Sequence, residues 1–321
     1  MLVTFRVRDE DKRIIDCMLR DLAEVIYLLP NKTLDPKNLE RIRVIITGSG
    51  LDIPDFVLEK AENLELIQTL SAGVDTLPLD RIPPNVIICS NAGGNSRAVA
   101  EHVFAMILSA IKRIIYHHKN MEKGIWERRR YGSMLMGKTL GIIGLGHVGR
   151  EIAKIGKCFG MRIYGINRSG KTDVDVDFIG TPESLDFVLR ESDIIVISVP
   201  LNKYTRGLIG AKELNTMKKN TILVNVSRGE VIDQRALFEH LRRNPEFVAC
   251  LDVWWKYPEK DTKTCLQDFP FHTLPNVIMT PHIAGFAREI REQVIKHAVE
   301  NVRKYLLGEK ISNIVRREDY L

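Results

Sequence analysis

A glycine-rich turn between a strand and a helix is the feature that most constrains the fold of this chain. Residues 144–149 have the pattern G-x-G-x-x-G, after the β-rich run 139–143 and before a helical stretch. The first glycine permits a tight turn, the second lets a pyrophosphate approach the backbone, and the third lets the helix pack on the strand. This context predicts a dinucleotide-binding unit. The residues predicted to contact the cofactor here are Gly144, Gly146, His147, Val148 and Gly149.

Strand-like and helical segments alternate on both sides of residue 100. In the first part, the predicted strands are 2–7, 25–28, 44–47, 66–70 and 86–89, and the predicted helices are 11–22, 36–42 and 54–63. In the second part, the predicted strands are 139–143, 161–166, 194–199, 221–226, 247–251 and 277–279, and the helices are 147–159, 182–190 and 233–243. Longer helices are predicted over 97–123 and 287–307. This alternation implies an α/β fold with parallel sheets covered by helices on both faces.

The length of 321 residues favours two domains, and 45% apolar with 27% charged residues is typical of a soluble globular protein. We expect a cytoplasmic location and no membrane association, because no apolar run approaches the ~20 residues of a membrane helix and the start lacks a signal-peptide core. The five cysteines are scattered without a C-x-x-C pair, so we expect reduced thiols and no metal site.

The net charge of +6 permits nucleic-acid binding, but small anions explain it equally well. The densest basic run, 128–130, holds three arginines, and a run this short is typical of a solvated face. We therefore expect no nucleic-acid partner.

The second strand of the nucleotide-binding unit ends in residues that bear on cofactor choice. NAD usually requires a carboxylate about 20 residues after the glycine turn, to accept hydrogen bonds from the ribose. Here Asn167 is neutral, while Arg168 and Ser169 offer charge and a hydroxyl to a 2′-phosphate. The sequence favours NADP, with NAD as the alternative if Arg168 is only a solvated turn residue.

Several segments together resemble the D-2-hydroxyacid dehydrogenases, the family of D-lactate, glycerate, phosphoglycerate and glyoxylate/hydroxypyruvate reductases. The matching segments are Ser71-Ala-Gly-Val-Asp75, Val99-Ala-Glu-His102, residues 137–146, Val199-Pro-Leu201, residues 205–209, residues 225–233, Leu251-Asp-Val253 and Thr280-Pro-His-Ile-Ala-Gly285. The resemblance implies two similar doubly wound domains with the cofactor domain inserted into the substrate domain. It implies a substrate (catalytic) domain over 1–96 plus 286–321, a Rossmann domain over 97–285, two long helices that connect them, and a homodimer through the cofactor domain.

The resemblance also implies site residues. Arg228 follows a strand at its carboxyl end, where a guanidinium can hold the carboxylate and carbonyl of a 2-oxo acid. His282 would protonate the alkoxide as hydride arrives. Backbone amides of Ala72, Gly73 and Val74 would bind the substrate carboxylate as a nest. By family position, Asn95 is a further substrate-binding residue, and the remaining cofactor-binding residues are Pro200, Thr205, Val226, Asp252, His282 and Gly285. The other histidines, His102 among them, are interpreted as helix-face or loop residues.

One catalytic position departs from the family. The family has a glutamate followed by proline 29 positions after the arginine, and this chain has Tyr257 followed by Pro258. The nearest acid, Glu259, is displaced by two residues. Without the carboxylate, His282 should be protonated less readily, although Tyr257 could still orient it. Neutralising such an acid costs about 10⁴ in rate in serine proteases, which we take as an upper bound.

Three functions follow from this pattern. The first is an NADP-preferring oxidoreductase of a small 2-oxo acid such as glyoxylate or hydroxypyruvate, with Arg228, His282 and Tyr257 at the catalytic centre. The second is a cofactor-sensing or interaction protein that has lost turnover. The third is an enzyme like formate dehydrogenase, whose reaction needs no acid-base proton transfer.

Overall fold

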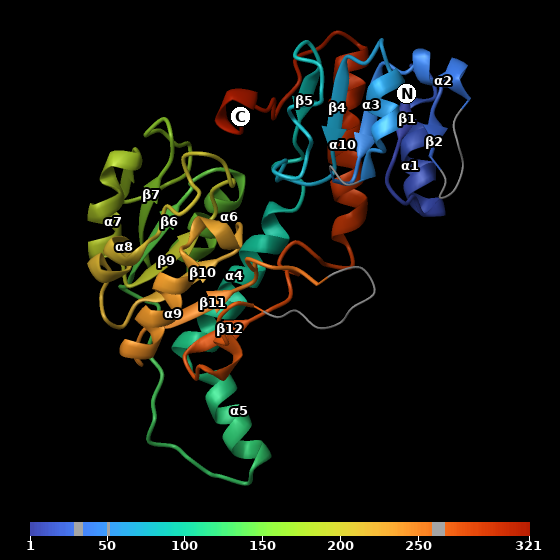
Figure 1. Cartoon of the computed structure of the whole chain (residues 1–321). Coiled ribbons are helices and arrows are strands. Elements are labelled where there is room, and N and C mark those ends of the chain that lie inside the picture. Colours follow the sequence, from blue (N-terminus) through green and yellow to red (C-terminus); the bar gives the residue numbers. More distant parts are fainter. Residues whose placement is uncertain (29–34, 50–51, 259–266) are drawn as a thin grey trace. The chain divides into compact units, whose positions relative to one another are not determined.

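The computed structural model describes residues 1–28, 35–49, 52–258 and 267–321. The chain divides into two compact units, each of which is described by itself (Figure 1). Unit 1 comprises Met1–Asn95 and Ala287–Leu321, and unit 2 comprises Ser96–Phe286. The domain boundaries predicted from the sequence, 96/97 and 285/286, each lie one residue from the boundaries between the two units. Glu259 and Cys265 lie outside the described residues.

Within its described residues, unit 1 is built on a five-stranded parallel sheet with the order β2-β1-β3-β4-β5. The strands are β1 (Leu2–Val3), β2 (Ile26–Tyr27), β3 (Val44–Thr47), β4 (Leu66–Thr69) and β5 (Ile87–Cys89). The helices are α1 (Asp9–Leu19), α2 (Pro36–Glu40), α3 (Asp55–Lys60) and α10 (Ile290–Leu306), followed by the short turn η5 (Arg317–Asp319).

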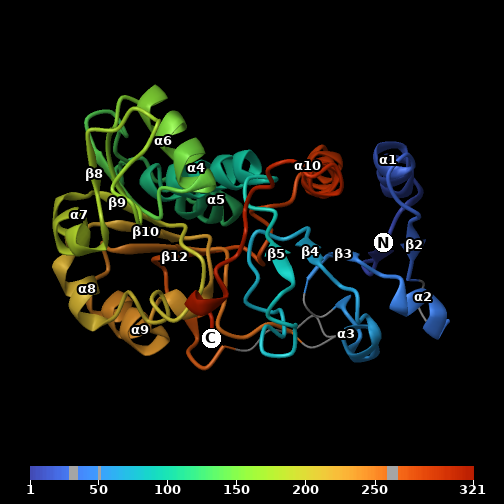
Figure 2. The same ribbon diagram turned by 90° about the horizontal axis from the view of Figure 1, so that it is seen from above.

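Both faces of this sheet are covered, which explains why its strands are mainly apolar. Ile45 and Ile67 pack in one core cluster with residues of α2 and α3. Val44 and Leu66 point to the opposite face and pack with α1 and α10. Figure 2 shows these two pairs of helices on opposite sides of the strands. The core of unit 1 therefore depends on a helix that follows unit 2 in the chain.

The described part of unit 2 contains a seven-stranded parallel sheet with the order β12-β11-β10-β9-β6-β7-β8. Its strands are β6 (Thr139–Ile143), β7 (Arg162–Ile166), β8 (Phe178–Gly180), β9 (Ile194–Ile197), β10 (Ile222–Asn225), β11 (Val248–Leu251) and β12 (Val277–Met279). Its α-helices are α4 (Ser96–Ile111), α5 (Ile114–Glu122), α6 (His147–Cys158), α7 (Leu185–Glu191), α8 (Ala211–Thr216) and α9 (Gln234–Arg243). Short 3-10 turns are η2 (Pro182–Ser184), η3 (Gly229–Val231) and η4 (Phe271–Thr273).

The strand β6 lies between β9 and β7, so successive strands are added in opposite directions from β6. In open α/β sheets, ligands bind at the carboxyl ends of the strands beside such a reversal. Helices α4 and α6 pack on one face of this sheet, and α7, α8 and α9 pack on the other. The glycine turn after β6 thus lies at the place where this fold class binds ligands.

The long helix predicted over 97–123 is wrong, because the structure has two helices there. Lys112 and Arg113 separate α4 from α5, and Arg113 adopts a left-handed conformation with φ 55°. The apolar spacing continues across the break, so periodicity gave no sign of it. The buried face stops at α4, since α5 has no buried residue.

The two units are joined at residues 95–96 and 286–287, next to the two helices that were expected to connect the domains. The crossings fall just before the helices, so α4 lies wholly in unit 2 and α10 wholly in unit 1. The first predicted strand, 2–7, is shortened to β1, and residues 4–8 form neither strand nor helix before α1 begins at Asp9. The strand β8 and the helix α8 were not predicted.

Candidate active site

The backbone of the glycine turn agrees with the role expected of each of its three glycines. Gly144 has φ +103°, and a Cβ there would lie 2.7 Å from the backbone of Ser198. A Cβ on Gly149 would lie 2.4 Å from the carbonyl oxygen of Gly144, so only glycine lets α6 approach the turn. By contrast, a Cβ on Gly146 would meet nothing within 4 Å. The backbone at Gly146 is therefore open to a ligand, at the N-terminus of a 12-residue helix.

These features fit the pyrophosphate of a dinucleotide. The unpaired N–H groups and the dipole at a helix N-terminus favour an anion there. Gly146 and His147 are exposed, and Val148 is half-buried. These are the residues that could hold the phosphates of a bound dinucleotide.

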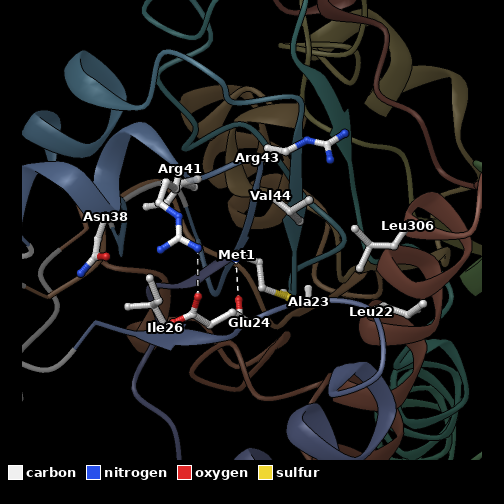
Figure 3. A pocket seen from close by; sticks show the side chains of 11 residues that line it. Met1, Leu22, Ala23, Glu24, Ile26, Asn38, Arg41, Arg43, Val44 and Leu306 are labelled. Atoms are coloured by element: carbon white, nitrogen blue, oxygen red, sulfur yellow. Dashed lines mark hydrogen bonds and ion pairs between the residues drawn. The ribbon is translucent and has the colours of Figure 1, made fainter.

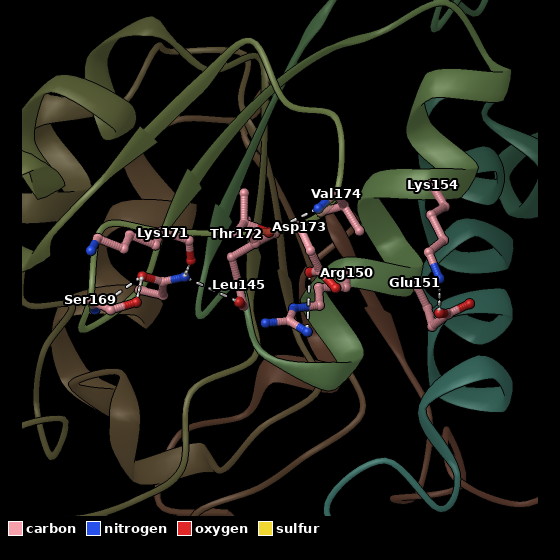
Figure 4. Close-up of polar contacts among 10 residues, drawn as sticks. Leu145, Arg150, Glu151, Lys154, Ser169, Lys171, Thr172, Asp173 and Val174 are labelled. Carbon is pink, nitrogen blue, oxygen red and sulfur yellow. Dashed lines mark hydrogen bonds and ion pairs between the residues drawn. The ribbon is translucent and has the colours of Figure 1, made fainter.

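Asn167 organises the turn at the predicted adenosine end. Its Oδ1 accepts hydrogen bonds from the backbone N–H of Ser169 at 3.1 Å and from its hydroxyl at 3.2 Å, and its Nδ2 donates to the Lys171 carbonyl at 2.7 Å. Arg168, Ser169 and Lys171 are exposed. Figure 4 shows Ser169 and Lys171 in this turn, and Arg150 of α6 paired with Asp173 at 3.2 Å. The turn presents two cationic side chains and a hydroxyl, and no acidic residue lies within 167–171.

The strand β9 leads into the next predicted cofactor residues. Pro200 is exposed, and its carbonyl oxygen accepts a hydrogen bond from the Thr205 hydroxyl at 2.6 Å. The same hydroxyl oxygen accepts from the Asn202 amide at 2.9 Å. Val226 is half-buried and directly follows β10. All three predicted residues are thus near the carboxyl ends of β9 and β10.

Arg228 follows β10 on a turn that Asn225 holds from inside. The buried Asn225 Oδ1 accepts from the Ser227 amide at 3.0 Å and hydroxyl at 2.8 Å, and its Nδ2 donates to the Arg228 carbonyl at 2.8 Å. The guanidinium of Arg228 donates to the Ser227 carbonyl at 2.9 Å. Arg228 is half-buried, so its position is fixed while part of its side chain stays accessible.

Asp252, directly after β11, is 1% exposed and binds the loop that carries His282. Its carboxylate accepts hydrogen bonds from the Thr280 hydroxyl at 2.6 Å and from the amides of Ile283 and Ala284, each at 2.9 Å. His282, within this loop, has φ +58°. A left-handed conformation at a residue other than glycine costs about 1–3 kcal/mol and persists only where neighbouring contacts hold it.

Tyr257 lies beside His282. The two ring centroids are 5.5 Å apart and the rings are inclined at 45°. Burial raises the pKa of Tyr257, while the hydrogen bond from the Trp254 amide and the nearby Arg228 act to lower it. The structure therefore places Arg228, Tyr257 and His282 in one neighbourhood of unit 2, although they are distant in sequence.

In unit 1, the predicted carboxylate nest follows β4. Ala72 is exposed, Gly73 is half-buried and Val74 is buried. Among the described residues, no hydrogen-bond acceptor takes the amides of residues 72–74. The predicted residue Asn95, which ends unit 1, is half-buried, as is Gly285 in unit 2.

Asn91 holds this nest loop. Its amide donates to the Ser71 carbonyl at 2.9 Å, and its Nδ2 donates to the carbonyls of Leu70 at 3.2 Å and Val294 at 2.9 Å. Its Oδ1 lies 2.5 Å from Nδ1 of His297 on α10. Sequence reasoning missed Asn91, as it missed Asn225 and Thr280. A polar residue in or just after an apolar strand was the available signal for Asn91 and Asn225.

A separate pocket of about 210 Å³ lies at the amino ends of β1, β2 and β3 (Figure 3). Its charged groups all have partners, and Arg43 pairs with Glu65 outside the pocket at 2.9 Å. The Met1 amine donates to the Glu24 carbonyl at 2.7 Å, and Arg41 pairs with the Glu24 carboxylate at 3.4 Å. This pocket contains none of the predicted site residues, which lie at the carboxyl ends of the strands.

Within the described residues, no group of three or more His, Cys, Asp or Glu side chains could hold a metal ion. None of the described helices is long and apolar enough to cross a membrane.

Residues 104–284 match the family model of the D-isomer specific 2-hydroxyacid dehydrogenase NAD binding domain. The chain is 36% identical over 271 residues to a glyoxylate reductase of Aeropyrum pernix, covering 82% of this chain and 79% of that protein. It is 35% identical over 286 residues to a D-3-phosphoglycerate dehydrogenase of Methanocaldococcus jannaschii, covering 86% of this chain and 53% of that protein. The chain thus spans about half the length of the second relative.

Among solved structures, a D-isomer specific 2-hydroxyacid dehydrogenase of Xanthobacter autotrophicus Py2 in complex with NADPH and MES superimposes with a TM-score of 0.82. The two chains are 26% identical, and the match covers 100% of each. The family model covers more than half of this chain, and the glyoxylate reductase is similar over most of its length. The chain therefore belongs to the D-isomer specific 2-hydroxyacid dehydrogenase family.

Proposed function

We propose that this protein transfers hydride between NADP(H) and a small 2-oxo or 2-hydroxy acid of the glyoxylate or hydroxypyruvate type. The observation that carries the proposal is the convergence of Arg228 and His282 at the carboxyl edge of the sheet that bears the glycine turn. The glyoxylate reductase named above supports the choice of substrate. We propose a cytoplasmic location as well, from the composition.

In this proposal, residues of both units bind the substrate, and one residue of unit 2 transfers the proton. Arg228 binds the carboxylate and the carbonyl oxygen of the 2-oxo acid through its planar guanidinium. As hydride adds to the carbonyl carbon, His282 donates a proton to that oxygen, which otherwise would remain a strongly basic alkoxide. The amides of residues 72–74 are proposed to bind the substrate carboxylate in unit 1. A bound nicotinamide cofactor supplies the hydride. Tyr257 orients the imidazole of His282 through ring contact.

The function is tested by NADPH oxidation with a panel of 2-oxo acids from pH 5 to 8. We expect turnover with glyoxylate or hydroxypyruvate, and a loss on the order of 10³-fold or more in His282→Ala. A background rate with every oxo acid over this pH range, in protein that binds NADPH, would refute the proposal and favour a sensing protein.

The preference for NADP is proposed from Arg168 and Ser169. Calorimetric titration with NADPH and NADH separately tests it in wild type and in Arg168→Ala. Loss of a charge-assisted bond should weaken NADPH binding about 10-fold or more and leave NADH binding unchanged. The matched control is Arg162→Ala, at the opposite end of the same strand β7. Equal losses for both cofactors would contradict the assignment.

Oxidation of formate is the second candidate, and Tyr257 favours it. Hydride leaves formate as carbon dioxide forms, so no proton has to be donated and the family glutamate is dispensable. Reduction of NADP by formate, measured beside the oxo-acid panel, distinguishes the two reactions.

We also propose a homodimer through unit 2. Figure 1 shows α5 and the loop after it reaching away from the sheet of that unit. Large apolar side chains between residues 114 and 136 are exposed by 37% to 80%. They are Ile114, Ile115, Met121, Ile125, Trp126, Tyr131, Met134 and Met136. Burial of such a patch is a strong drive to association. Sedimentation should show a dimer that Trp126→Ser with Tyr131→Ser weakens, whereas Tyr204→Ser does not.

A further inference from the structure

The loop that carries His282 is fixed on both sides of that residue. Before it, Thr280 donates its amide to the Leu251 carbonyl at 2.9 Å, and its own carbonyl accepts from the Trp254 indole N–H at 3.0 Å. After it, the amides of Ile283 and Ala284 donate to Asp252. The left-handed conformation of His282 is thus held from both ends by residues at and after the end of β11.

A histidine from a distant helix joins this arrangement. Nε2 of His102, on α4, lies 3.1 Å from the Thr280 hydroxyl oxygen and 3.7 Å from Oδ1 of Asp252. The side chain of His102 is 20% exposed, so it is mostly shielded from water.

The direction of the hydrogen bonds follows from the chemistry of the groups. A carboxylate only accepts, so the Thr280 hydroxyl donates its single proton to Asp252. The Thr280 oxygen can then only accept from His102, which fixes the proton of His102 on Nε2. The result is a chain of donors from His102 to Thr280 to Asp252, and the Asp252 carboxylate also accepts from the two amides that follow His282.

We propose that His102 is a positioning residue for His282. It does not touch the substrate. It orients the Thr280 hydroxyl through a hydrogen bond. The Thr280 hydroxyl in turn holds the Asp252 carboxylate where it can accept from the two amides after His282. This inference rests on the proposed function, since it assigns His282 the proton transfer, and it adds to the site a residue on a different element.

The first experiment compares two substitutions of His102. His102→Leu removes the donor, and His102→Gln retains an N–H donor of similar reach. With the oxo acid that turns over, we expect His102→Leu to lower kcat on the order of 10- to 100-fold, the effect of a small misplacement of a reacting group. The Kd for NADPH should stay within about 2-fold, and His102→Gln should recover most of kcat.

His240→Leu is the matched control. His240 is a half-buried histidine of α9 that packs edge-on against Phe247, and its Nε2 has no hydrogen-bond partner among the described residues. Removing it should leave kcat and NADPH binding unchanged. If His102→Leu behaves like His240→Leu, or if His102→Gln is folded and as slow as His102→Leu, the proposal is wrong.

The second measurement does not require turnover. Hydrogen exchange followed by mass spectrometry should show faster exchange of peptides covering residues 280–285 in His102→Leu, with peptides of α6 unchanged and recovery in His102→Gln. In Thr280→Val the same peptides should exchange faster, and the double variant should add little, because both changes break one chain of bonds. Additive effects, or unchanged exchange in both single variants, would overturn the inference. An inactive wild type that shows the expected exchange pattern would refute the proposed reaction and leave the positioning intact.

Discussion

In unit 1 a neutral amide, Asn91, fixes the loop after β4, whereas in unit 2 a buried carboxylate, Asp252, fixes the loop after β12. A histidine from a helix contacts each arrangement, His297 in unit 1 and His102 in unit 2. The amide both donates and accepts, so it links carbonyls to the histidine. The carboxylate only accepts and gathers three donors. Hydrogen bonds to the charged carboxylate of Asp252 are stronger than those to the neutral amide of Asn91. Removal of the carboxylate also leaves more buried donors without an acceptor. We conclude that the loop of unit 2 is held more firmly and is more costly to disturb.

The largest effect should come from truncating these two residues. Asp252→Ala leaves a hydroxyl and two amides without their acceptor and should destabilise unit 2 by about 3–5 kcal/mol. Asn91→Ala should cost unit 1 about 1–3 kcal/mol. Equal losses would contradict the comparison.

Each unit carries its own probe for this measurement. Cys89 in β5 and Cys250 in β11 are fully buried, and burial raises the pKa of Cys89 to about 11 and that of Cys250 to about 12. Their alkylation in urea therefore reports opening of unit 1 and unit 2 separately. Cys17 and Cys158 are exposed and can be blocked first.

Two glycines of unit 2 separate the effects of folding from those of binding. Gly149→Ala places a methyl group against the Gly144 carbonyl and should destabilise unit 2 by about 1–3 kcal/mol, with loss of NADPH binding. Gly146→Ala enters open space, so it should leave the urea midpoint nearly unchanged and weaken NADPH binding alone. Calorimetry beside Cys250 alkylation checks both, and a stable Gly149→Ala variant would refute the tight approach.

The smallest expected effect is on the stability of unit 1 at acidic pH. Burial acts to raise the pKa of Asp11, but hydrogen bonds from Arg291 and from the Arg8 amide outweigh it, so the pKa is lowered. The resulting stabilisation of unit 1 is complete above the unfolded pKa of about 4 and is lost as the pH falls through the lower folded value.

Asp11→Asn should therefore cost unit 1 about 1.5 kcal/mol at pH 7 and flatten its stability below pH 4. Urea midpoints from Cys89 alkylation at pH 7 and pH 3 measure both quantities, with the exposed Asp9→Asn as control. An unchanged acid slope in Asp11→Asn would contradict the assignment.

Local patterns predicted much of the fold. The strands β3, β6 and β12 have the predicted bounds, because each is a short apolar run bounded by polar or turn residues. The break at Arg113 escaped prediction since the apolar spacing runs through it, and β8 escaped because it has only two apolar residues, followed by Gly180. Length and composition alone favoured two domains, whereas the insertion of one domain into the other was inferred from the family resemblance.

The candidate site was predicted where a residue stands in a motif and missed where it acts through a distant partner. The sequence marks Arg228 and His282 by their places after strands. His102 and Thr280 are 178 positions apart, and Asn91 and His297 are 206 apart. No spacing rule connects residues at such separations, so His102 was assigned to a helix face without a role.

Because α10 forms part of the core of unit 1, the two units cannot complete their folding in the order in which they are synthesised. Unit 2 is one continuous stretch, so it can complete its core as soon as it has emerged from the ribosome. Unit 1 begins first but lacks Ile295, Val299 and Val302, which cover the face formed by β1, β3 and β4, until translation passes residue 302. The first 95 residues must therefore wait with this apolar face covered by α1 alone while the whole of unit 2 is synthesised. A chaperone that binds apolar surface has its longest opportunity on this nascent N-terminal segment, and arrested translation before α10 leaves a folded unit 2 joined to an incomplete unit 1.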